Sequence, residues 1–557
     1  MPVLNRAHQL AQLRDQAFDV LVIGGGISGA AVARDAARRG LRTGLIEARD
    51  FAEGTSSRSS RLVHGGLRYL EHFELDLVFE GSQERRRLLR IAPHLVRPLE
   101  FFFPIFEAGR VGRVKLDAGM WLYDALSLFR NIERHQMLDA DDLLESEPGL
   151  RSEDLLGGAR YFDAQVDDAR LVITTVIGGI EAGAAMANRT EALEIDTSNW
   201  PGNRVVARDV EGGADWPIDA LAVVNATGPW ADETLRRTGT EVPGTLVPTR
   251  GTHIHIRQER LGHSHAFIFE SPSDGRVMFV LPWRDLTLIG TTDDYYEGAP
   301  EDVTPTREDV QYLLASTNYL FPDAELTEAD VISAWAGLRP LVAEGDGDDD
   351  AGEGEVSRDF TIREDPPGLF TLAGGKLTSH RAMAEETVDR IVPFLAKAGV
   401  KPVAKCDTAR VALPGGNVQD LAELKTHVRR DAAELGVSEE GADRLTRAYG
   451  LRAGHLLELV RRQPELAHPI LDGRPHIGAE AIHAVRAEMA LHIEDVLFRR
   501  TRIGLETRDD IEGAAHRAGS LMATELDWTK KDLAREVRRA TEIRQRDDRA
   551  WRAPEKP

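Results

Sequence analysis

Residues 18–47 read FDVLVIGGGISGAAVARDAARRGLRTGLIE, and this stretch decides the fold of the chain. The apolar run at residues 20–23 has the length and branching of a buried parallel strand. Glycines follow as Gly24, Gly26 and Gly29. The first allows a tight turn, the second lets a pyrophosphate approach the main chain, and the third lets a helix over about 28–39 pack closely on the strand.

The residues after this helix complete the pattern of a dinucleotide-binding βαβ unit. Gly40 stops the helix, residues 42–46 form a second strand, and Glu47 stands at its end, where a carboxylate accepts hydrogen bonds from an adenosine ribose. The free N–H groups and the dipole of the helix meet the phosphates. A lone glycine motif is weak, but these parts in this order predict dinucleotide binding. The alternative is an ordinary βαβ unit with a glycine-rich turn.

Composition restricts the class of protein. The 557 residues suffice for two or three domains, and 42% hydrophobic with 29% charged residues is typical of a globular protein. The only cysteine, Cys406, excludes an internal disulfide and a cysteine-ligated cluster in this chain. The net charge of −23 argues against a nucleic-acid partner, which would need a basic surface.

No segment of the sequence is typical of a membrane span or a metal site. Residues 1–17 lack the apolar run of a signal peptide, and no stretch is apolar for the length of a transmembrane helix. We therefore expect a protein that is soluble or lies on a membrane face. The acidic segment 344–355, EGDGDDDAGEGE, is interpreted as a solvated loop, and no metal is expected.

Residues 51–72 read FAEGTSSRSSRLVHGGLRYLEH and show no helical or strand periodicity. Hydroxyls and main-chain amides at this density can hold a phosphate or a ring system, although a serine-rich surface loop would look the same. Together with the glycine turn, this segment resembles the amino-terminal signature of FAD-dependent glycerol-3-phosphate dehydrogenase, the quinone-linked respiratory family. Further segments resemble the family in the same order: 166–172 (VDDARLV), 224–230 (VNATGPW), 290–293 (GTTD), 337–341 (GLRPL) and 374–378 (GGKLT).

The resemblance implies an α/β fold in three parts. An FAD-binding Rossmann-type domain is expected over residues 1–95, 156–247 and 333–396, and an antiparallel-sheet substrate domain over 96–155 and 248–332. A C-terminal α-helical domain is expected over 404–557, where the composition shifts to Ala, Leu, Glu and Arg. Its last helix, about 525–552, is rich in Arg and is interpreted as a solvated face, with a membrane or partner contact as the alternative.

FAD is favoured over NAD because a second glycine-marked helix start lies far along the chain, at 374–376, where amides can hold a flavin ring. The cofactor-binding residues that the glycine turn and the resemblance imply are Gly24, Gly26, Ile27, Ser28, Gly29, Glu47, Thr55, Ser56, Ser59, Ser60, Leu62, His64, Gly65, Gly228, Gly375, Lys376, Leu377 and Thr378.

The resemblance also implies the substrate and the reaction. In this family sn-glycerol 3-phosphate is oxidised to dihydroxyacetone phosphate, and the expected substrate-binding residues are Arg68, Tyr69, His253, Thr292, Arg339 and Arg358. Guanidinium groups suit a phosphate dianion. His253 is the candidate base, with Arg339 and Lys376 as further catalytic residues, although a histidine in an alternating strand is more often a core residue.

The expected acceptor is a quinone, on the cytoplasmic face of the inner membrane. Clustered aromatics at 101–106 lie near Arg110, Arg113 and Lys115 in the sequence, and such residues either enter a membrane interface or form a strand and a core helix. A homodimer is compatible with the sequence. The alternatives left open are a glycerophosphate oxidase that uses oxygen, an amino-acid oxidase of the wider superfamily, and a flavin-binding scaffold without catalysis.

Overall fold

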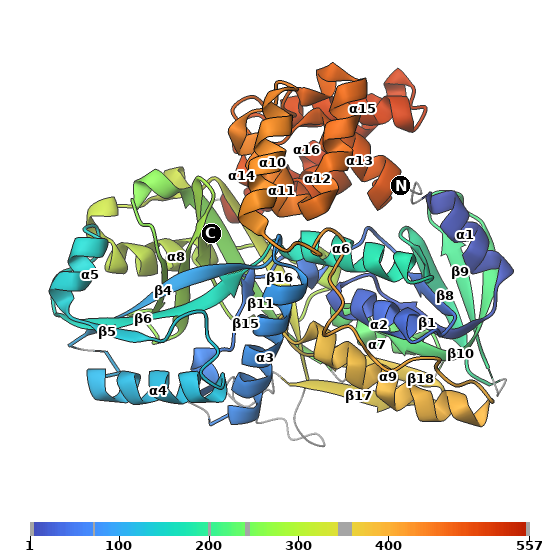
Figure 1. The fold of residues 1–557 in the computed structure, drawn as a ribbon, viewed down its shortest axis with the longest axis horizontal. Helices are drawn as coiled ribbons and strands as arrows, with labels where there is room; N and C mark the ends of the chain where they lie inside the picture. Colours follow the sequence, from blue (N-terminus) through green and yellow to red (C-terminus); the bar gives the residue numbers. More distant parts are fainter. Residues whose placement is uncertain are drawn as a thin grey trace, which may run out of the picture.

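A computed structural model describes residues 5–70, 73–107, 109–198, 202–239, 246–342 and 359–552, apart from the side chain of Arg68. The acidic segment 344–355 lies outside these residues. The described chain forms two sheets side by side, with their helices, and a helical domain that lies above both (Figure 1). We call the part with the two sheets, residues 5–397, the sheet core.

The first sheet is built around the glycine-turn segment. Its main path runs in the order β17–β18–β10–β1–β2–β7, and the neighbours from β18 to β7 are parallel. The strands are β1 (Phe18–Ile23), β2 (Thr43–Ile46), β7 (Ala185–Ala187), β10 (Asp215–Asn225), β17 (Phe360–Glu364) and β18 (Leu369–Gly374). All six residues of β1 are buried, as its apolar run predicts.

Helices cover the first sheet on the face that holds the largest part of its core. These are α2 (Ile27–Arg38), α6 (Asp168–Glu181) and α9 (His380–Lys397). On the other face, α1 (Arg6–Asp15) and the hairpin of β8 (Thr190–Asp196) and β9 (Asn203–Asp209) complete a second cluster. The Asp167 side chain caps α6, because it accepts from the Arg170 N–H at 3.2 Å. The predicted helix at Gly374 begins later, at His380, because Gly374 and Gly375 have positive φ.

The second sheet is mixed, with one parallel neighbour pair, β4 and β12, among antiparallel pairs. Its strands are β3 (Leu62–Val63), β4 (Arg97–Phe106), β5 (Gln136–Leu138), β6 (Leu155–Gln165), β11 (Leu246–Arg257), β12 (Ala266–Glu270), β13 (Val277–Trp283), β14 (Leu286–Gly290), β15 (Asp294–Tyr295) and β16 (Ser333–Val342). α8 (Arg307–Leu320) packs on one face, and α3 (Leu75–Ile91) and α4 (Arg113–Leu126) lie against the other.

Three strands that the predicted boundaries assign to the FAD-binding domain pair in the second sheet: β3, β6 and β16. β6 pairs with β4 over its length, and β16 pairs with β11 from Leu246 and Val342 to His255 and Ser333. Ladder hydrogen bonds hold these strands there, although their flanking segments return to the first sheet. The domain boundaries therefore stay a prediction, whereas the fold class is confirmed.

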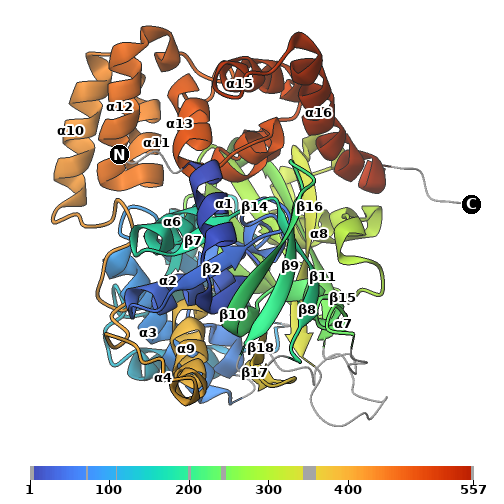
Figure 2. The ribbon, with the colours of Figure 1, turned by 90° about the vertical axis from the view of Figure 1, so that its right-hand side faces the viewer.

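The C-terminal helices pack on both sheets (Figure 2). They are α10 (Leu421–Ala433), α11 (Glu439–Tyr449), α12 (Ala453–Arg462), α13 (Gly478–Glu488), α14 (Ile503–Glu506), α15 (Ile511–Glu525) and α16 (Lys530–Arg552). The prediction that the last helix, α16, is solvated is wrong for one of its faces. Trp551 is fully buried in the core of the second sheet, and Arg544 is buried as well. Among the described helices, none combines the length and apolar composition that crossing a bilayer requires.

Candidate active site

The glycine turn has the geometry that close approach of a cofactor requires. Gly24 has φ +112°, and a Cβ there would lie 2.5 Å from the carbonyl oxygen of Ala226. A Cβ on Gly29 would lie 2.0 Å from the carbonyl oxygen of Gly24. No larger residue fits either position, so strand and helix meet as tightly as a dinucleotide fold demands. Gly26 caps α2, whose first turn contains Ile27 and Ser28.

Glu47 closes the other side of the turn. Its carboxylate accepts hydrogen bonds from the N–H of Gly25 at 2.5 Å and of Arg49 at 2.8 Å. Burial raises the pKa of Glu47, and these two N–H donors oppose the rise. The carboxylate is therefore fixed at the end of β2, where the sequence places the ribose contact.

The hydroxyl-rich loop at residues 55–60 lies across the N-terminus of α2. Ser56 Oγ accepts from the N–H of Ile27 at 3.0 Å, and Thr55 Oγ1 donates to the carbonyl oxygen of Leu338 at 2.6 Å. Ser59 Oγ donates to Asp168 at 2.8 Å, and Ser60 Oγ is 2.9 Å from His253 Nε2. The loop thus joins the glycine turn to the second sheet, and the surface-loop interpretation does not describe it.

His253 is buried at the seam between the two sheets. Its ring stacks on Trp335 with centroids 5.7 Å apart, and its Nδ1 has no hydrogen-bond partner in the described chain. Burial, followed by the charges of Arg339 and Arg61, lowers the pKa of His253 to about 3. The imidazole is therefore neutral at physiological pH.

Arg339 lies in β16, one strand from His253. Its guanidinium donates to Asp293 at 2.8 Å, to Thr291 Oγ1 at 3.0 Å and to the carbonyl oxygen of Thr292 at 3.0 Å. Thr292 Oγ1 in turn accepts from the N–H of Thr252 at 3.0 Å. The predicted residues Thr292, Arg339 and His253 are therefore brought together by β11 and β16 and by the segment after β14.

A second group of predicted residues surrounds the later glycine turn. Gly375 has φ +85°, and a Cβ there would lie 2.3 Å from the Met383 side chain. The ammonium of Lys376 lies 3.6 Å from the centre of the Tyr69 ring, a cation–π contact. Thr378 Oγ1 accepts from the N–H of His64 at 3.1 Å. This turn and the 51–72 segment, far apart in sequence, therefore form one wall.

The remaining predicted residues lie around these two groups. Leu62 is in β3, paired with Gln165, and the Gly65 N–H donates to the Tyr123 hydroxyl at 3.0 Å. Gly228 begins a short 3₁₀ turn with φ +59°, and the Leu377 carbonyl accepts from His380 Nδ1 at 2.7 Å. Arg358 and the Arg68 side chain lie outside the described part of the chain.

Within the described residues, no group of three or more His, Cys, Asp or Glu is arranged to hold a metal ion.

These observations fit a bound dinucleotide. The tight glycine turn, the helix N-terminus and the fixed carboxylate suit its adenosine diphosphate half, and the second glycine turn faces the loop that would hold its ring. A family model for FAD-dependent oxidoreductases matches residues 19–390. The chain belongs to this family. A model for the C-terminal domain of α-glycerophosphate oxidase matches residues 406–533.

Several proteins that are similar to this oxidoreductase have a more specific name than the family does. It is 35% identical over 507 residues to the aerobic glycerol-3-phosphate dehydrogenase of Staphylococcus haemolyticus, which covers 90% of this chain and 89% of the relative. The Bacillus subtilis relative of the same name is 36% identical over 505 residues, 89% of each chain. The glycerol-3-phosphate dehydrogenase of Bacillus halodurans, solved with FAD, has a TM-score of 0.78, 31% identity and 97% coverage of both chains. FAD is thus the cofactor of the oxidoreductase.

A more distant structure shares the fold alone. The L-α-glycerophosphate oxidase of Mycoplasma pneumoniae, solved with FAD bound, has a TM-score of 0.57 at 19% identity. It covers 72% of this chain and 99% of its own.

Sequence reasoning missed three residues at the site. Arg61 is buried over the Trp283 ring at 4.2 Å, and burial, with the charge of Arg502, lowers its pKa to about 10. Asp168 was part of the quoted 166–172 motif but received no role. Arg502 binds Asp168 from the helical domain, and no motif around it marked this contact.

Proposed function

We propose that the oxidoreductase converts sn-glycerol 3-phosphate to dihydroxyacetone phosphate and passes the electrons to a quinone at the cytoplasmic face of a membrane. The observation that carries the proposal is the identity of about 35% with named aerobic glycerol-3-phosphate dehydrogenases, which extends over about nine tenths of the chain. The described site supports it, because a buried neutral imidazole and a guanidinium lie on adjacent strands.

In this proposal His253 accepts the hydroxyl proton of the substrate. Its Nε2 is engaged with Ser60 and its Nδ1 has no partner in the described chain, so one nitrogen can act as a base. A pKa of about 3, caused by burial and then by the charges of Arg339 and Arg61, makes the imidazole a weak base before the substrate binds. A bound phosphate dianion offsets Arg339 and Arg61 and therefore raises the pKa of His253 toward the operating range.

Arg339 is proposed to bind the phosphate. Asp293 and the Thr291–Thr292 segment already hold its guanidinium, so little conformational entropy is lost when the substrate binds. Arg68, Tyr69, Thr292 and Arg358 remain proposed substrate contacts, and Lys376, held over Tyr69, is proposed to contact both substrate and cofactor. When bound, FAD accepts the hydride from C2 of the substrate.

An apolar pocket supports the quinone part of the proposal. It has a volume of about 250 Å³ and is lined by Leu67 and Leu70 of the 3₁₀ turn Leu67–Leu70 and by residues of α4, β12 and β13, among others. Tyr69, on the same turn, contacts Lys376 of the second glycine turn. The 3₁₀ turn Leu67–Leu70 thus lies between the second glycine turn, which is expected to hold the flavin ring, and a pocket whose lining suits an apolar acceptor.

The surface beside this pocket supports membrane contact. Exposed apolar side chains gather on and after α4: Val114, Trp121, Leu122, Leu128 and Phe129. Phe73 and Phe79, at and near the start of α3, are exposed as well, and Arg113 and Lys115 lie on α4. Aromatic and aliphatic side chains beside basic ones are typical of helices that lie in a membrane interface. Residues 101–106 lie in β4.

A steady-state assay tests the proposal. The purified holoenzyme is given sn-glycerol 3-phosphate with a short-chain quinone, and dihydroxyacetone phosphate, quinol and hydrogen peroxide are measured. We expect equal amounts of dihydroxyacetone phosphate and quinol, with little peroxide. Peroxide in place of quinol would make the protein an oxidase, and no product with either acceptor would remove glycerol 3-phosphate as the substrate.

A further inference from the structure

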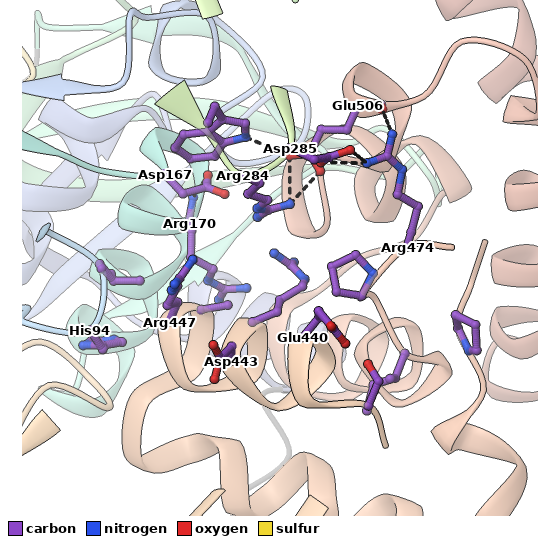
Figure 3. A pocket seen from close by; sticks show the side chains of 18 of the residues that line it. His94, Asp167, Arg170, Arg284, Asp285, Glu440, Asp443, Arg447, Arg474 and Glu506 are labelled. Carbon is purple, nitrogen blue, oxygen red and sulfur yellow. Dashed lines mark hydrogen bonds and ion pairs between the residues drawn. The ribbon is translucent and has the colours of Figure 1, made fainter. Parts of the chain in front are cut away.

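A cavity of about 820 Å³ lies between the helical domain and the sheet core (Figure 3). Its core wall includes Arg97 at the start of β4, Asp167 at the start of α6 and Arg284 after β13. Its opposite wall includes Asp443 and Arg447 of α11. The volume lies within the range of about 300–1,000 Å³ that small-molecule sites occupy.

Most charges in this cavity are neutralised by partners within the protein. The guanidinium groups of four lining arginines form ion pairs: Arg170 with Glu488 at 2.5 Å, Arg284 with Glu506 at 2.6 Å, Arg444 with Glu480 at 2.8 Å, and Arg474 with Asp285 at 2.8 Å. Two of the lining carboxylates are also paired: Asp167 with Arg502, and Asp443 with Lys425 and Arg429.

Two guanidinium groups are left without a carboxylate among the described residues. Arg97 donates to the side-chain carbonyl of Gln165 and lies over the Trp283 ring at 5.8 Å, but it forms no ion pair. Arg447 is exposed and has neither a hydrogen bond nor an ion pair within the described chain. Asp443, one turn before it, faces Lys425 at 2.9 Å and Arg429 at 2.6 Å instead.

One lining carboxylate, Glu440, also has no ion pair in the described chain. It lies at the start of α11, whereas Arg447 lies near the end of this helix (Figure 3). Glu440 and Arg447 are seven positions apart, a rise of about 10 Å along the helix axis. At that separation water and salt screen most of the attraction between the two charges.

Arg97 and Arg447 oppose each other electrostatically. Burial, then Arg447 and Arg284, lowers the pKa of Arg97 to about 10. Like charges that face one cavity without a counterion are unfavourable, and an anion between them relieves the repulsion. We propose that this cavity binds the phosphate monoester of a small organic molecule between Arg97 and Arg447.

The charge of the ligand follows from the two uncompensated cations. A phosphate monoester carries about −1.5 to −2 at neutral pH and can compensate both guanidinium groups, whereas a single carboxylate compensates one. Planar guanidinium forks bind phosphate oxygens in pairs. The volume leaves room for the organic part of the ligand. Because the two arginines belong to different parts of the fold, the bound ligand links the helical domain to the sheet core, independently of the proposed dehydrogenase reaction.

Hydrogen–deuterium exchange of the holoenzyme tests this proposal locally. Inorganic phosphate and phenyl phosphate are the probes, in a phosphate-free buffer, with acetate as the matched monoanion. We expect both phosphates to slow exchange in the segments 94–97 and 436–448, and acetate to have little effect. Because the measurement reports on these segments, binding at the candidate active site does not confuse it.

Variants separate this site from general anion binding. Arg447→Gln removes a side chain without partners in the described chain, so the fold is retained. We expect this variant to bind phenyl phosphate at least about tenfold more weakly than the unaltered protein does. Arg461→Gln, on the exposed face of α12, is the control and should bind as the unaltered protein does. Equal protection in Arg447→Gln and the unaltered protein overturns the proposal, and so does the absence of protection by both phosphates.

Discussion

Arg502 of the helical domain binds the carboxylate of Asp168, and Asp168 accepts two hydrogen bonds from Ser59 in the cofactor loop. The Ser59 hydroxyl and N–H lie 2.8 and 3.1 Å from the same oxygen of Asp168. The guanidinium, which is buried, also donates to the carbonyl oxygen of Ser57 at 3.0 Å. The helical domain therefore fixes the loop that faces the cofactor.

Replacement of Arg502 should weaken cofactor binding. Arg502→Gln leaves Asp168 buried without its cation, and breaking a buried pair in this way costs about 3–5 kcal/mol of stability. We expect a lower melting temperature and, because the Ser57–Ser59 loop loosens, at least a tenfold higher dissociation constant for FAD, measured by titration of the apoprotein.

Arg486→Gln provides the matched control for this loss. Arg486 pairs with Glu525 inside the helical domain at 2.6 Å and is partly exposed. It should leave FAD affinity unchanged. If both variants bind FAD equally well, Arg502 has only a structural role in joining the two parts.

Replacement of His253 should slow turnover more than it weakens substrate binding. His253→Gln cannot accept the substrate proton, and loss of a general base lowers kcat by about 10²- to 10⁴-fold. KM should change little. His263→Gln, which alters another buried histidine hydrogen-bonded to Thr287 at 2.7 Å, controls for packing. An unchanged kcat in His253→Gln would place the base elsewhere.

His492 should make stability depend on alkaline pH. Its ring nitrogens lie 2.9 Å from Glu211 and 2.9 Å from Glu536, while Asp495, Arg189 and Arg539 face it as well. Although burial opposes it, the two glutamates raise the pKa of His492 to about 9.

The sign of the effect follows from the raised pKa. The folded protein holds the His492 proton more tightly than the unfolded chain, so this stabilisation is complete below about pH 6.5 and is lost as pH rises through about 9. His492→Gln should melt at a lower temperature at pH 6.5, and the difference should vanish near pH 10. A constant difference across this range would show that His492 is neutral in the folded protein.

Membrane attachment should depend on the exposed face of α4. Trp121 is 49% exposed, and Leu451, in the helical domain, is 50% exposed. Trp121→Glu should reduce co-sedimentation with anionic lipid vesicles and quinone reduction in them, while reduction of the flavin by substrate in solution stays unchanged. Leu451→Glu should alter neither. Equal vesicle binding by both variants would move the contact away from α4.

The sequence allowed prediction of the parts whose chemistry is local. The glycine turn and Glu47 follow from backbone and strand-end requirements that a few adjacent residues satisfy. The fold class followed from the order of these parts and from the family resemblance, and the sheet topology agrees with it.

Contacts between segments that are far apart in the sequence could not be predicted in this way. β16 looked like a return to the first sheet, but its pairing with β11 depends on a partner about ninety residues away. The Arg502–Asp168 pair joins residues 334 positions apart, and neither neighbourhood contains a periodic signal for it. The burial of one face of α16 could not be predicted for the same reason. Its arginines predicted a solvent-exposed helix, whereas Trp551 packs into the second sheet.

Anaerobic reduction of the flavin tests the central claim most directly. The visible spectrum of the purified holoenzyme is recorded without oxygen or quinone, and sn-glycerol 3-phosphate is then added. We predict loss of the oxidised flavin band near roughly 450 nm and one dihydroxyacetone phosphate per flavin, because the cofactor accepts the two electrons. A flavin that stays oxidised in protein shown to contain FAD would contradict the account.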